Sequence, residues 1–220
     1  MLLQPPSQKM SPLVIACDID EVIFPYIAGY VKYYNRIHGG STLSPSDFHS
    51  YNFSLVHGGT EADIADLVYA FHEEPEFRET EPIAGSLHAI EQLRNLGAQV
   101  HFVSARQKAI STQTVDWIGR HFGNVGIERI HLGNHFTRSS DLDTQTRSKA
   151  EMCMQIGAKV LIDDSVSNAL ECAQVGMQVF LFDLHGEYGW NKQPAEHPNI
   201  SRVLNWEQVV DGVRKCKRSD

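Results

Sequence analysis

The sequence lacks the cysteine patterns of a disulfide-rich or zinc-binding protein. Its four cysteines, at positions 17, 153, 172 and 216, form no CxxC pair and have no histidines at zinc-finger spacing. They exclude a disulfide framework and predict a reducing compartment. The chain also lacks a run of about 18 apolar residues, the length of a membrane-spanning helix. The opening segment MLLQPPSQKM has no apolar stretch of signal-peptide length, so we expect a cytoplasmic protein with no membrane partner.

Positive charge is also scarce. The 220 residues include 19 Lys and Arg against 27 Asp and Glu, a formal net charge of −8. Nucleic-acid polymers are held by clusters of Lys and Arg, so this balance argues against a nucleic acid as partner. A small anionic substrate remains compatible, because one pocket can be positive on an acidic protein. The length fits one domain with an insertion, or two small domains.

Short apolar runs rich in β-branched residues recur along the chain. They are typical of strands covered on both faces, and they lie at residues 13–17, 99–103, 128–132, 158–162 and 178–182. Between them the sequence predicts helices at 86–97, 146–157 and 165–176, each ending in a glycine that can cap a helix. This alternation predicts an α/β fold, a doubly wound parallel sheet with a Rossmann-like core.

One interval interrupts this alternation. Residues 25–85 carry mainly helical patterns, such as YIAGYVKYYNRIHG, and are far too long for a strand-to-helix loop. We predict an inserted helical cap over 25–85 and a catalytic core formed by 1–24 and 86–220. Within the core, 183–201 is rich in Gly, Pro, Asn and His and predicts a loop. A last helix is expected at roughly 205–216.

Candidate site residues stand at the carboxyl ends of the predicted strands, where open parallel sheets bind ligands. They are Asp18 and Asp20 after the first strand, Ser104, Ala105 and Arg106 after the second, and Asp163 and Asp164 after the fourth. Four neighbouring carboxylates repel one another unless they bind a cation, and Mg²⁺ is the usual occupant of a carboxylate and phosphate site. Lys149, at the start of a predicted helix, adds a counter-charge.

Each of these residues alone has a simpler interpretation. A pair of aspartates after an apolar run is commonly a helix N-cap, and so is a serine. A single lysine is most often at the surface. Their combination, in this order and always at a strand end or a helix start, favours a magnesium site over these separate interpretations.

Such a set of residues can transfer a phosphoryl group. One carboxylate can attack phosphorus and form an aspartyl-phosphate. A second, two residues on, can protonate the leaving oxygen and later activate water. Mg²⁺ and Lys149 would offset the charge of the phosphoryl group, and Ser104 with nearby backbone amides would bind its oxygens.

The set resembles the four motifs of the haloacid dehalogenase-like (HAD) superfamily of phosphohydrolases. The matching segments are DID (18–20), VSAR (103–106), Lys149 and DD (163–164). The resemblance implies that Asp18 is the nucleophile and a metal ligand. It implies that Asp20 is the general acid and base, with its backbone carbonyl on the metal. Because the dehalogenase branch lacks this second acid, the chain looks like a phosphatase.

The resemblance also assigns the phosphate and metal contacts. Lys149 would hold the phosphoryl group and the nucleophile, and the segment Ser104, Ala105 and Arg106 would bind the substrate phosphate. Asp163 or Asp164 would complete the metal site. Asn168 follows Asp164 by four positions, a spacing used in the superfamily, so Asp164 is favoured as the direct ligand and Asp163 as its neighbour.

The cap and the tail narrow the resemblance to one branch. The segments SYNF (50–53), YGWN (188–191) and RVLNWEQV (202–209) are similar to the 5′(3′)-deoxyribonucleotidase-like branch. The chain differs from the pattern of this branch at two places, and both differences bear on the choice of substrate more than on the phosphoryl chemistry. Many members have glycine where this chain has Glu21, which needs another place or another backbone angle. Several nucleotidases also differ from the SAR of the second motif.

Several residues allow more than one interpretation. Arg106 either clamps a substrate phosphate or projects to solvent. Trp190 either packs on the sheet, which is favoured, or lines the mouth of the site with Asn191. Cys17 is expected to point into the sheet as a small apolar residue. Aromatic residues of the cap either form its core, which is favoured, or stack on a substrate base; they are Tyr26, Tyr30, Tyr33, Tyr34, Phe48, Tyr51 and Phe53.

The predicted function is Mg²⁺-dependent hydrolysis of small phosphomonoesters through an aspartyl-phosphate, with nucleoside monophosphates as candidate substrates. A sugar-phosphate or other metabolite phosphatase is an alternative in the same fold, and so is a phosphotransferase or phosphomutase. A non-catalytic protein that binds a phosphate ligand is the alternative from another class, although the intact motif set argues against it. The expected partner is a small phosphorylated metabolite, and the oligomeric state is open, with a homodimer as one alternative.

Overall fold

A six-stranded parallel sheet forms the centre of the protein, in the order β3-β2-β1-β4-β5-β6. The strands are β1 (Val14–Cys17), β2 (Gln99–Ser104), β3 (Ile130–Leu132), β4 (Val160–Asp163), β5 (Gln178–Phe182) and β6 (Ile200–Val203). The structure, a computed structural model, describes residues 11–40, 42–123, 125–138 and 140–219. The opening segment, on which the expected absence of a signal peptide rests, lies outside these ranges. The predicted α/β class with a parallel, doubly wound sheet is confirmed.

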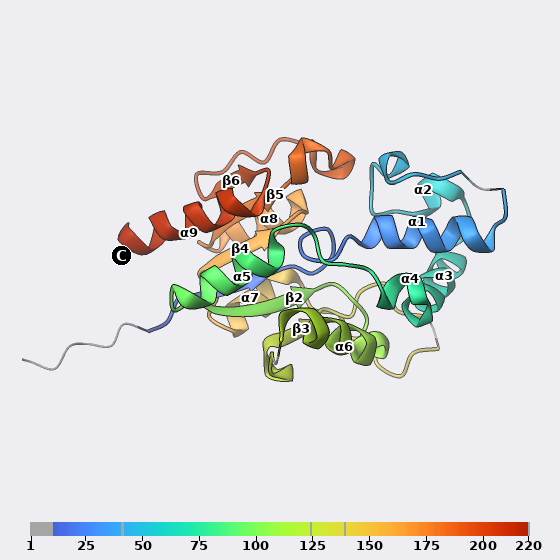
Figure 1. Ribbon diagram of the computed structural model, residues 1–220, viewed down its shortest axis with the longest axis horizontal. Coiled ribbons are helices and arrows are strands. Elements are labelled where there is room, and N and C mark those ends of the chain that lie inside the picture. Colours follow the sequence, from blue (N-terminus) through green and yellow to red (C-terminus); the bar gives the residue numbers. More distant parts are fainter. Residues whose placement is uncertain (1–10, 41, 124, 139, 220) are drawn as a thin grey trace, which may run out of the picture.

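Helices cover both faces of this sheet (Figure 1). One face packs against α5 (Ser86–Asn95), α6 (Ser111–Phe122) and α9 (Trp206–Ser219), and the other against α7 (Lys149–Gln155) and α8 (Val166–Gln174). Side chains alternate between the faces along β1, so Cys17 joins the apolar cluster of the first face and Ala16 that of the second. Because the central strands β1, β4 and β5 are buried on both faces, their sequences are nearly continuous apolar runs.

Glycines end three of the helices before a strand begins. Gly97, Gly157 and Gly176 have φ values of +80°, +70° and +89°, the left-handed conformation that favours glycine. Each glycine lets the chain leave a helix and turn back into the sheet within two or three residues. The three glycines that the sequence indicates as helix caps therefore have the backbone conformation that this role requires.

Two elements are not among those predicted from the sequence. Strand β6 lies partly within 183–201, where a loop is predicted, so that expectation is wrong at its end. This edge strand has four residues and exposes Ser201 and Arg202, so it shows no apolar run. Helix α6 begins with the polar sequence STQT and buries only Thr114, Trp117, Ile118 and Phe122. Its apolar stripe is therefore short and easily missed.

The segment 25–85 forms a group of helices beside the carboxyl end of β1 (Figure 1). They are α1 (Tyr26–Ile37), α2 (Ser54–His57), α3 (Glu61–Glu73) and α4 (Pro75–Arg78). Tyr30 lies at their centre, with its ring centroid 4.8 Å from that of Phe53 and 5.8 Å from that of Phe71. The chain enters and leaves this segment at neighbouring points, where the Ile83 N–H donates to the Ile23 carbonyl at 2.9 Å.

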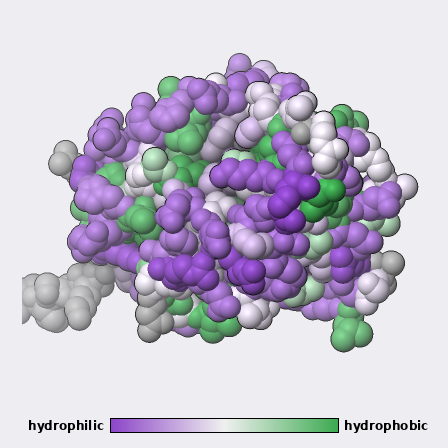
Figure 2. All heavy atoms as spheres, turned by 45° about the vertical axis from the view of Figure 1, so that its right-hand side comes forward, coloured by the Kyte–Doolittle hydropathy of each residue, from purple (hydrophilic) through white to green (hydrophobic). Residues whose placement is uncertain are grey.

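One face of the molecule is seen in Figure 2, coloured by hydropathy. Figure 2 shows hydrophilic residues over most of the face turned forward, with smaller hydrophobic areas between them. Among the described residues, no helix combines the length and the apolar character needed to cross a membrane.

A histidine pair joins β2 to β3, and we expect it to make the stability of the protein depend on pH. A ring nitrogen of His101 lies 3.0 Å from one of His131. Burial, with Arg129 nearby, lowers the pKa of His101, and burial also lowers that of His131. Because the unfolded chain keeps a histidine pKa of about 6.5, it binds more protons than the folded protein at mildly acidic pH. The pair therefore contributes stability above that pH, and this contribution is lost as the pH falls towards the lower folded pKa values.

We expect the double variant His101→Gln, His131→Gln to show a smaller decrease in the free energy of unfolding between pH 7.5 and pH 5.5 than the wild type. Urea unfolding across this pH range measures the difference. Because the two proteins share every other titrating group, the difference isolates the pair. Equal slopes in the two proteins would show that the pair is protonated equally in the folded and unfolded states.

Candidate active site

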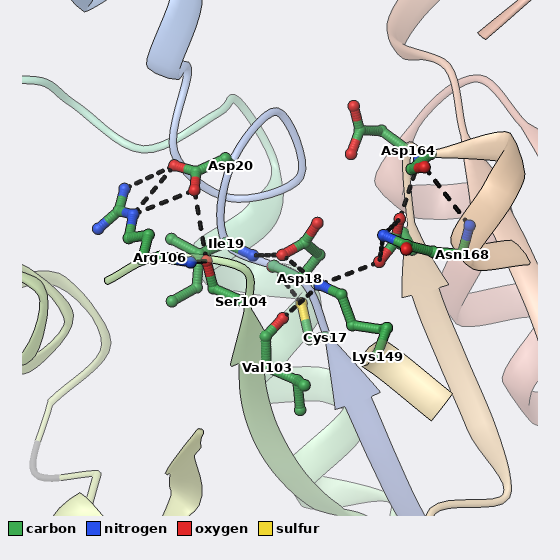
Figure 3. A network of polar contacts seen from close by, with 12 residues as sticks. Cys17, Asp18, Ile19, Asp20, Val103, Ser104, Arg106, Lys149, Asp164 and Asn168 are labelled. Carbon is green, nitrogen blue, oxygen red and sulfur yellow. Dashed lines mark hydrogen bonds and ion pairs between the residues drawn. The ribbon is translucent and has the colours of Figure 1, made fainter. Parts of the chain in front are cut away.

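Strand β1 brings Asp18 to the carboxyl end of the sheet. Its backbone N–H donates to the Ile162 carbonyl at 2.9 Å, which continues the pairing of β1 with β4. Its carboxylate Oδ1 accepts the N–H of Ile19 at 2.7 Å. The chain then turns tightly, so that Asp18 points towards Lys149 while Asp20 points towards Arg106 (Figure 3). The two carboxylates of the DID segment therefore have different partners.

Lys149 connects three strands at this edge. It is the first residue of α7, and Ser148 caps that helix by accepting the N–H of Glu151. The ammonium group lies 2.7 Å from Asp18 Oδ1 and 3.1 Å from Asp163 Oδ2, and it donates to the Val103 carbonyl at 2.7 Å. Although burial opposes its charge, Asp163 and Asp18 raise the pKa of Lys149 above its usual range. The lysine is therefore a fixed positive charge between two buried carboxylates.

The two aspartates at the end of β4 have separate environments. Asp163 is fully buried and accepts hydrogen bonds from the Ser165 N–H at 2.9 Å and from the Asn168 side chain at 3.1 Å. The Asn168 side chain therefore binds Asp163, the neighbour of the residue that the four-residue spacing favours as the direct metal ligand. The Oδ2 atom of Asp164 accepts a hydrogen bond from Trp190 Nε1 at 2.6 Å.

Three carboxylates are grouped closely enough to hold a metal ion. One oxygen from each of Asp18, Asp163 and Asp164 lies within 4.8 Å of the others, and all three residues are buried. Burial and the neighbouring carboxylates raise the pKa of Asp18 and of Asp164, and Lys149 opposes the rise at Asp18. A buried set of carboxylate oxygens fits a hard divalent cation such as Mg²⁺. The side chain of Asp20 lies outside this group.

Asp20 forms an ion pair with Arg106. The guanidinium Nη2 lies 2.6 Å from Asp20 Oδ1, and Nε lies 3.1 Å from Oδ2. Arg106 is only 4% exposed, and its guanidinium carbon lies 4.8 Å from the ring centre of Phe24 and 5.1 Å from that of Phe77. It therefore does not project to solvent. Its guanidinium group is bound to Asp20, the carboxylate that the family resemblance assigns to proton transfer.

The segment after β2 lies next to this ion pair. Ser104 is fully buried; its hydroxyl lies 3.4 Å from Asp20 Oδ2 and accepts the backbone N–H of Arg106 at 3.1 Å. Ala105 lies between them, and its carbonyl accepts the N–H of His135 at 2.9 Å. The structure thus places Ser104, Ala105 and Arg106 together beside the DID segment.

Glu21 stands where many family members have glycine, directly after the second aspartate. Its φ is +57°, so this glutamate has the left-handed backbone conformation that glycine would adopt more easily. Its side chain is buried and accepts the N–H of Ile27, near the start of α1, at 2.6 Å. Burial raises the pKa of Glu21 to about 8, and the hydrogen bond from Ile27 opposes this rise. The turn therefore has glycine-like geometry with a polar link to α1.

Two residues for which packing was the favoured interpretation contact the site. Trp190 was expected to pack on the sheet, and it does stack on Tyr188 with ring centroids 4.6 Å apart, but its indole N–H also binds Asp164. Tyr51 belongs to the aromatic set expected in the cap core, yet it is 39% exposed and its hydroxyl contacts the Asp164 carboxylate. Tyr51 lies in the segment SYNF and Trp190 in the segment YGWN, but the sequence of these segments does not show that both residues bind Asp164.

A family model described as 5′ nucleotidase, deoxy (pyrimidine), cytosolic type C protein matches residues 12–218. A nucleotidase of Clostridium acetobutylicum is 24% identical over 141 residues. That match spans 64% of this chain and 61% of the length of the relative.

Solved structures of low sequence identity share the fold. A HAD family hydrolase from Deinococcus radiodurans, solved with bound phosphate and sodium, has a TM-score of 0.60 and 13% identity, over 93% of this chain and 96% of its own. A predicted phosphatase from Clostridium acetobutylicum has a TM-score of 0.63 and 12% identity, over 93% and 99%. At this identity the likeness concerns the arrangement of the sheet and helices.

Proposed function

The chain belongs to the family of 5′ nucleotidases, deoxy (pyrimidine), cytosolic type C, and from this premise we propose that it is a metal-dependent phosphatase of small phosphomonoesters. Membership of the HAD superfamily, which the four motifs had suggested, is confirmed by the family match and by the shared fold. The observation that carries the proposal is the position of Lys149, in contact with both Asp18 and Asp163 at the edge of a buried carboxylate group.

In this proposal Asp18 is the nucleophile. Its carboxylate oxygen attacks phosphorus and the bond to the leaving oxygen breaks. Asp20, which takes up a proton from solvent when Arg106 moves to the phosphate, gives that proton to the leaving oxygen. Asp20 then takes a proton from water, which attacks the aspartyl-phosphate and releases inorganic phosphate, so that Asp18 is regenerated and Asp20 again carries a proton. Lys149 supports both steps because its ammonium group lies 2.7 Å from Asp18 Oδ1 and can offset negative charge on the phosphoryl group.

The buried carboxylates of Asp18 and Asp164 would hold Mg²⁺, together with the backbone carbonyl of Asp20, and Asp163 lies beside them. When bound, the ion neutralises charge on the nucleophile and on the phosphate oxygens. Asp163 also accepts hydrogen bonds from Lys149 and Asn168, so we assign it to orienting the site and Asp164 to direct contact with the ion.

The phosphate oxygens are assigned to Ser104, to the backbone amide of Ala105, to Arg106 and to Lys149. Arg106 can serve the phosphate only by loosening its ion pair with Asp20, which frees Asp20 for proton transfer at the same time. The guanidinium group would thus exchange one anionic partner for another when the substrate enters.

We assign residues 25–85 to a cap over this site, with 1–24 and 86–220 as the core. The contact of Tyr51 with Asp164 and the stacking of Arg106 near Tyr26, at 5.9 Å from its ring centre, support this assignment. Nucleoside monophosphates are the proposed substrates. The family description and the printed name of the clostridial relative support this choice. The expected cytoplasmic location is supported by the same description.

The test is phosphate release from a panel of deoxynucleoside monophosphates, nucleoside monophosphates and sugar phosphates, with Mg²⁺ or with a chelator. We expect release that requires Mg²⁺ and a preference for nucleotides of roughly 10-fold or more in kcat/KM. Equal rates across the panel would refute the nucleotide assignment. No release from any substrate with Mg²⁺ would refute the phosphatase assignment and favour the phosphate-binding alternative.

A further inference from the structure

The carboxylate of Asp164 receives two hydrogen bonds on the same oxygen. Oδ2 accepts the indole N–H of Trp190 at 2.6 Å and also the hydroxyl of Tyr51. Among the described residues, no hydrogen bond reaches Oδ1. An indole N–H can only donate, so Trp190 cannot itself hold a cation. The two donors therefore fix the direction of the carboxylate and leave Oδ1 as the oxygen available to an ion.

Trp190 is held rigidly. It is 9% exposed, and its ring stacks on Tyr188 at an interplanar angle of 21°. The hydroxyl of Tyr188 donates to the Glu21 carbonyl at 2.7 Å, which ties this stack to the turn that carries Asp18 and Asp20. The neighbouring Asn191 is fully buried and donates to the Phe182 carbonyl at 2.9 Å. The core thus provides one fixed donor to Asp164.

Tyr51 provides the second donor from another part of the chain. It lies within the segment 25–85, and its ring centroid is 5.5 Å from that of Trp190. It is 39% exposed, so it has much less support from packing than Trp190. Its contact with Asp164 is therefore made only when the loop around Tyr51 lies against the core.

We infer that Trp190 and Tyr51 are positioning residues that orient Asp164 for a divalent cation, and that Tyr51 links cation affinity to the position of the segment 25–85. This inference rests on the proposed function, because that function assigns Asp164 to the metal site. Hydrogen bonds to a ligating carboxylate fix its orientation, and their removal typically weakens metal binding by about 10-fold to 100-fold.

The test measures Mg²⁺ affinity without substrate, from the dependence of the melting temperature on Mg²⁺ concentration. We expect Trp190→Phe and Tyr51→Phe each to weaken the affinity by about 10-fold or more. The matched controls are Trp206→Phe, which removes an indole N–H bound to the Val22 carbonyl, and Tyr69→Phe, which removes a hydroxyl bound to Asp141. Both controls should keep the wild-type affinity, whatever their effect on the melting temperature without Mg²⁺.

Three results would overturn the inference. They are an unchanged affinity in both site variants, a tighter affinity in Tyr51→Phe, which would make Tyr51 a competitor of the ion, and a wild type that does not bind Mg²⁺. Tyr51 is half-exposed at the surface, so its variant is expected to fold even if Trp190→Phe does not. If Mg²⁺ binding follows the expected pattern but no phosphomonoester is hydrolysed, the proposed function fails while this inference stands.

Discussion

Replacement of Asp18 by Asn is expected to lower phosphate release by roughly 10⁴-fold or more, since loss of a nucleophile removes most of an enzyme's rate enhancement. The amide has nearly the shape of the carboxylate, and its oxygen can still accept the Ile19 N–H and the Lys149 ammonium, the two hydrogen bonds made by Oδ1. An amide cannot, however, form an aspartyl-phosphate. Release of inorganic phosphate at saturating Mg²⁺ measures the loss, and a single-turnover assay in acid-quenched samples tests for the phosphorylated protein.

Asp211→Asn, on α9, is the control for this substitution, and it should keep the wild-type rate. Circular dichroism and urea unfolding should show that Asp18→Asn is folded. A folded Asp18→Asn protein that retains activity would mean that another group attacks phosphorus. If activity were lost without any phosphorylated intermediate in the wild type, Asp18 would act as a metal ligand alone.

Replacement of Lys149 by Met is expected to destabilise the protein by about 3–5 kcal/mol near neutral pH without Mg²⁺, the usual cost of removing one partner from a buried ion pair. Asp18 and Asp163 would then be buried without their cation. Burial already raises the pKa of Asp18, and Lys149 opposes this rise. Without Lys149 the pKa of Asp18 would rise further, so protonation would favour the folded state and the variant would become less stable as the pH rises. The difference from the wild type should therefore shrink from pH 7.5 towards pH 4.5. Urea unfolding in the presence of a chelator measures both effects.

Lys108→Met is the matched control, because Lys108 forms an exposed ion pair with Asp143 at the surface. Exposed pairs are screened by solvent, so this variant should be nearly as stable as the wild type. If Lys149→Met were as stable as Lys108→Met at pH 7.5, the two carboxylates would be able to share a proton or reach water without the lysine.

The sheet could be predicted because burial on both faces makes each central strand an apolar run. That signal is strong for β1 and β5 and absent from β6, which is a four-residue edge strand with exposed polar side chains. Helix α6 was missed because its buried residues are few and mixed with polar ones. The apolar pattern of the sequence thus predicts the central strands better than the edge strand, which pairs with one neighbour only and can keep exposed polar side chains.

The sequence by itself determined which groups stand at the strand ends, since Asp18 follows its strand, Asp163 closes its strand, and Lys149 starts a capped helix. Only the tertiary structure decided which of these groups touch. Arg106 forms an ion pair with Asp20, which lies 86 positions away in the sequence. The Asn168 side chain donates a hydrogen bond to Asp163. Asp164 accepts a hydrogen bond from Tyr51, which lies 113 positions away. Strand ends depend on local apolar pattern, whereas side-chain pairing depends on how turns and packed helices aim each group. The spacing of residues along the sequence does not show in which direction a side chain points.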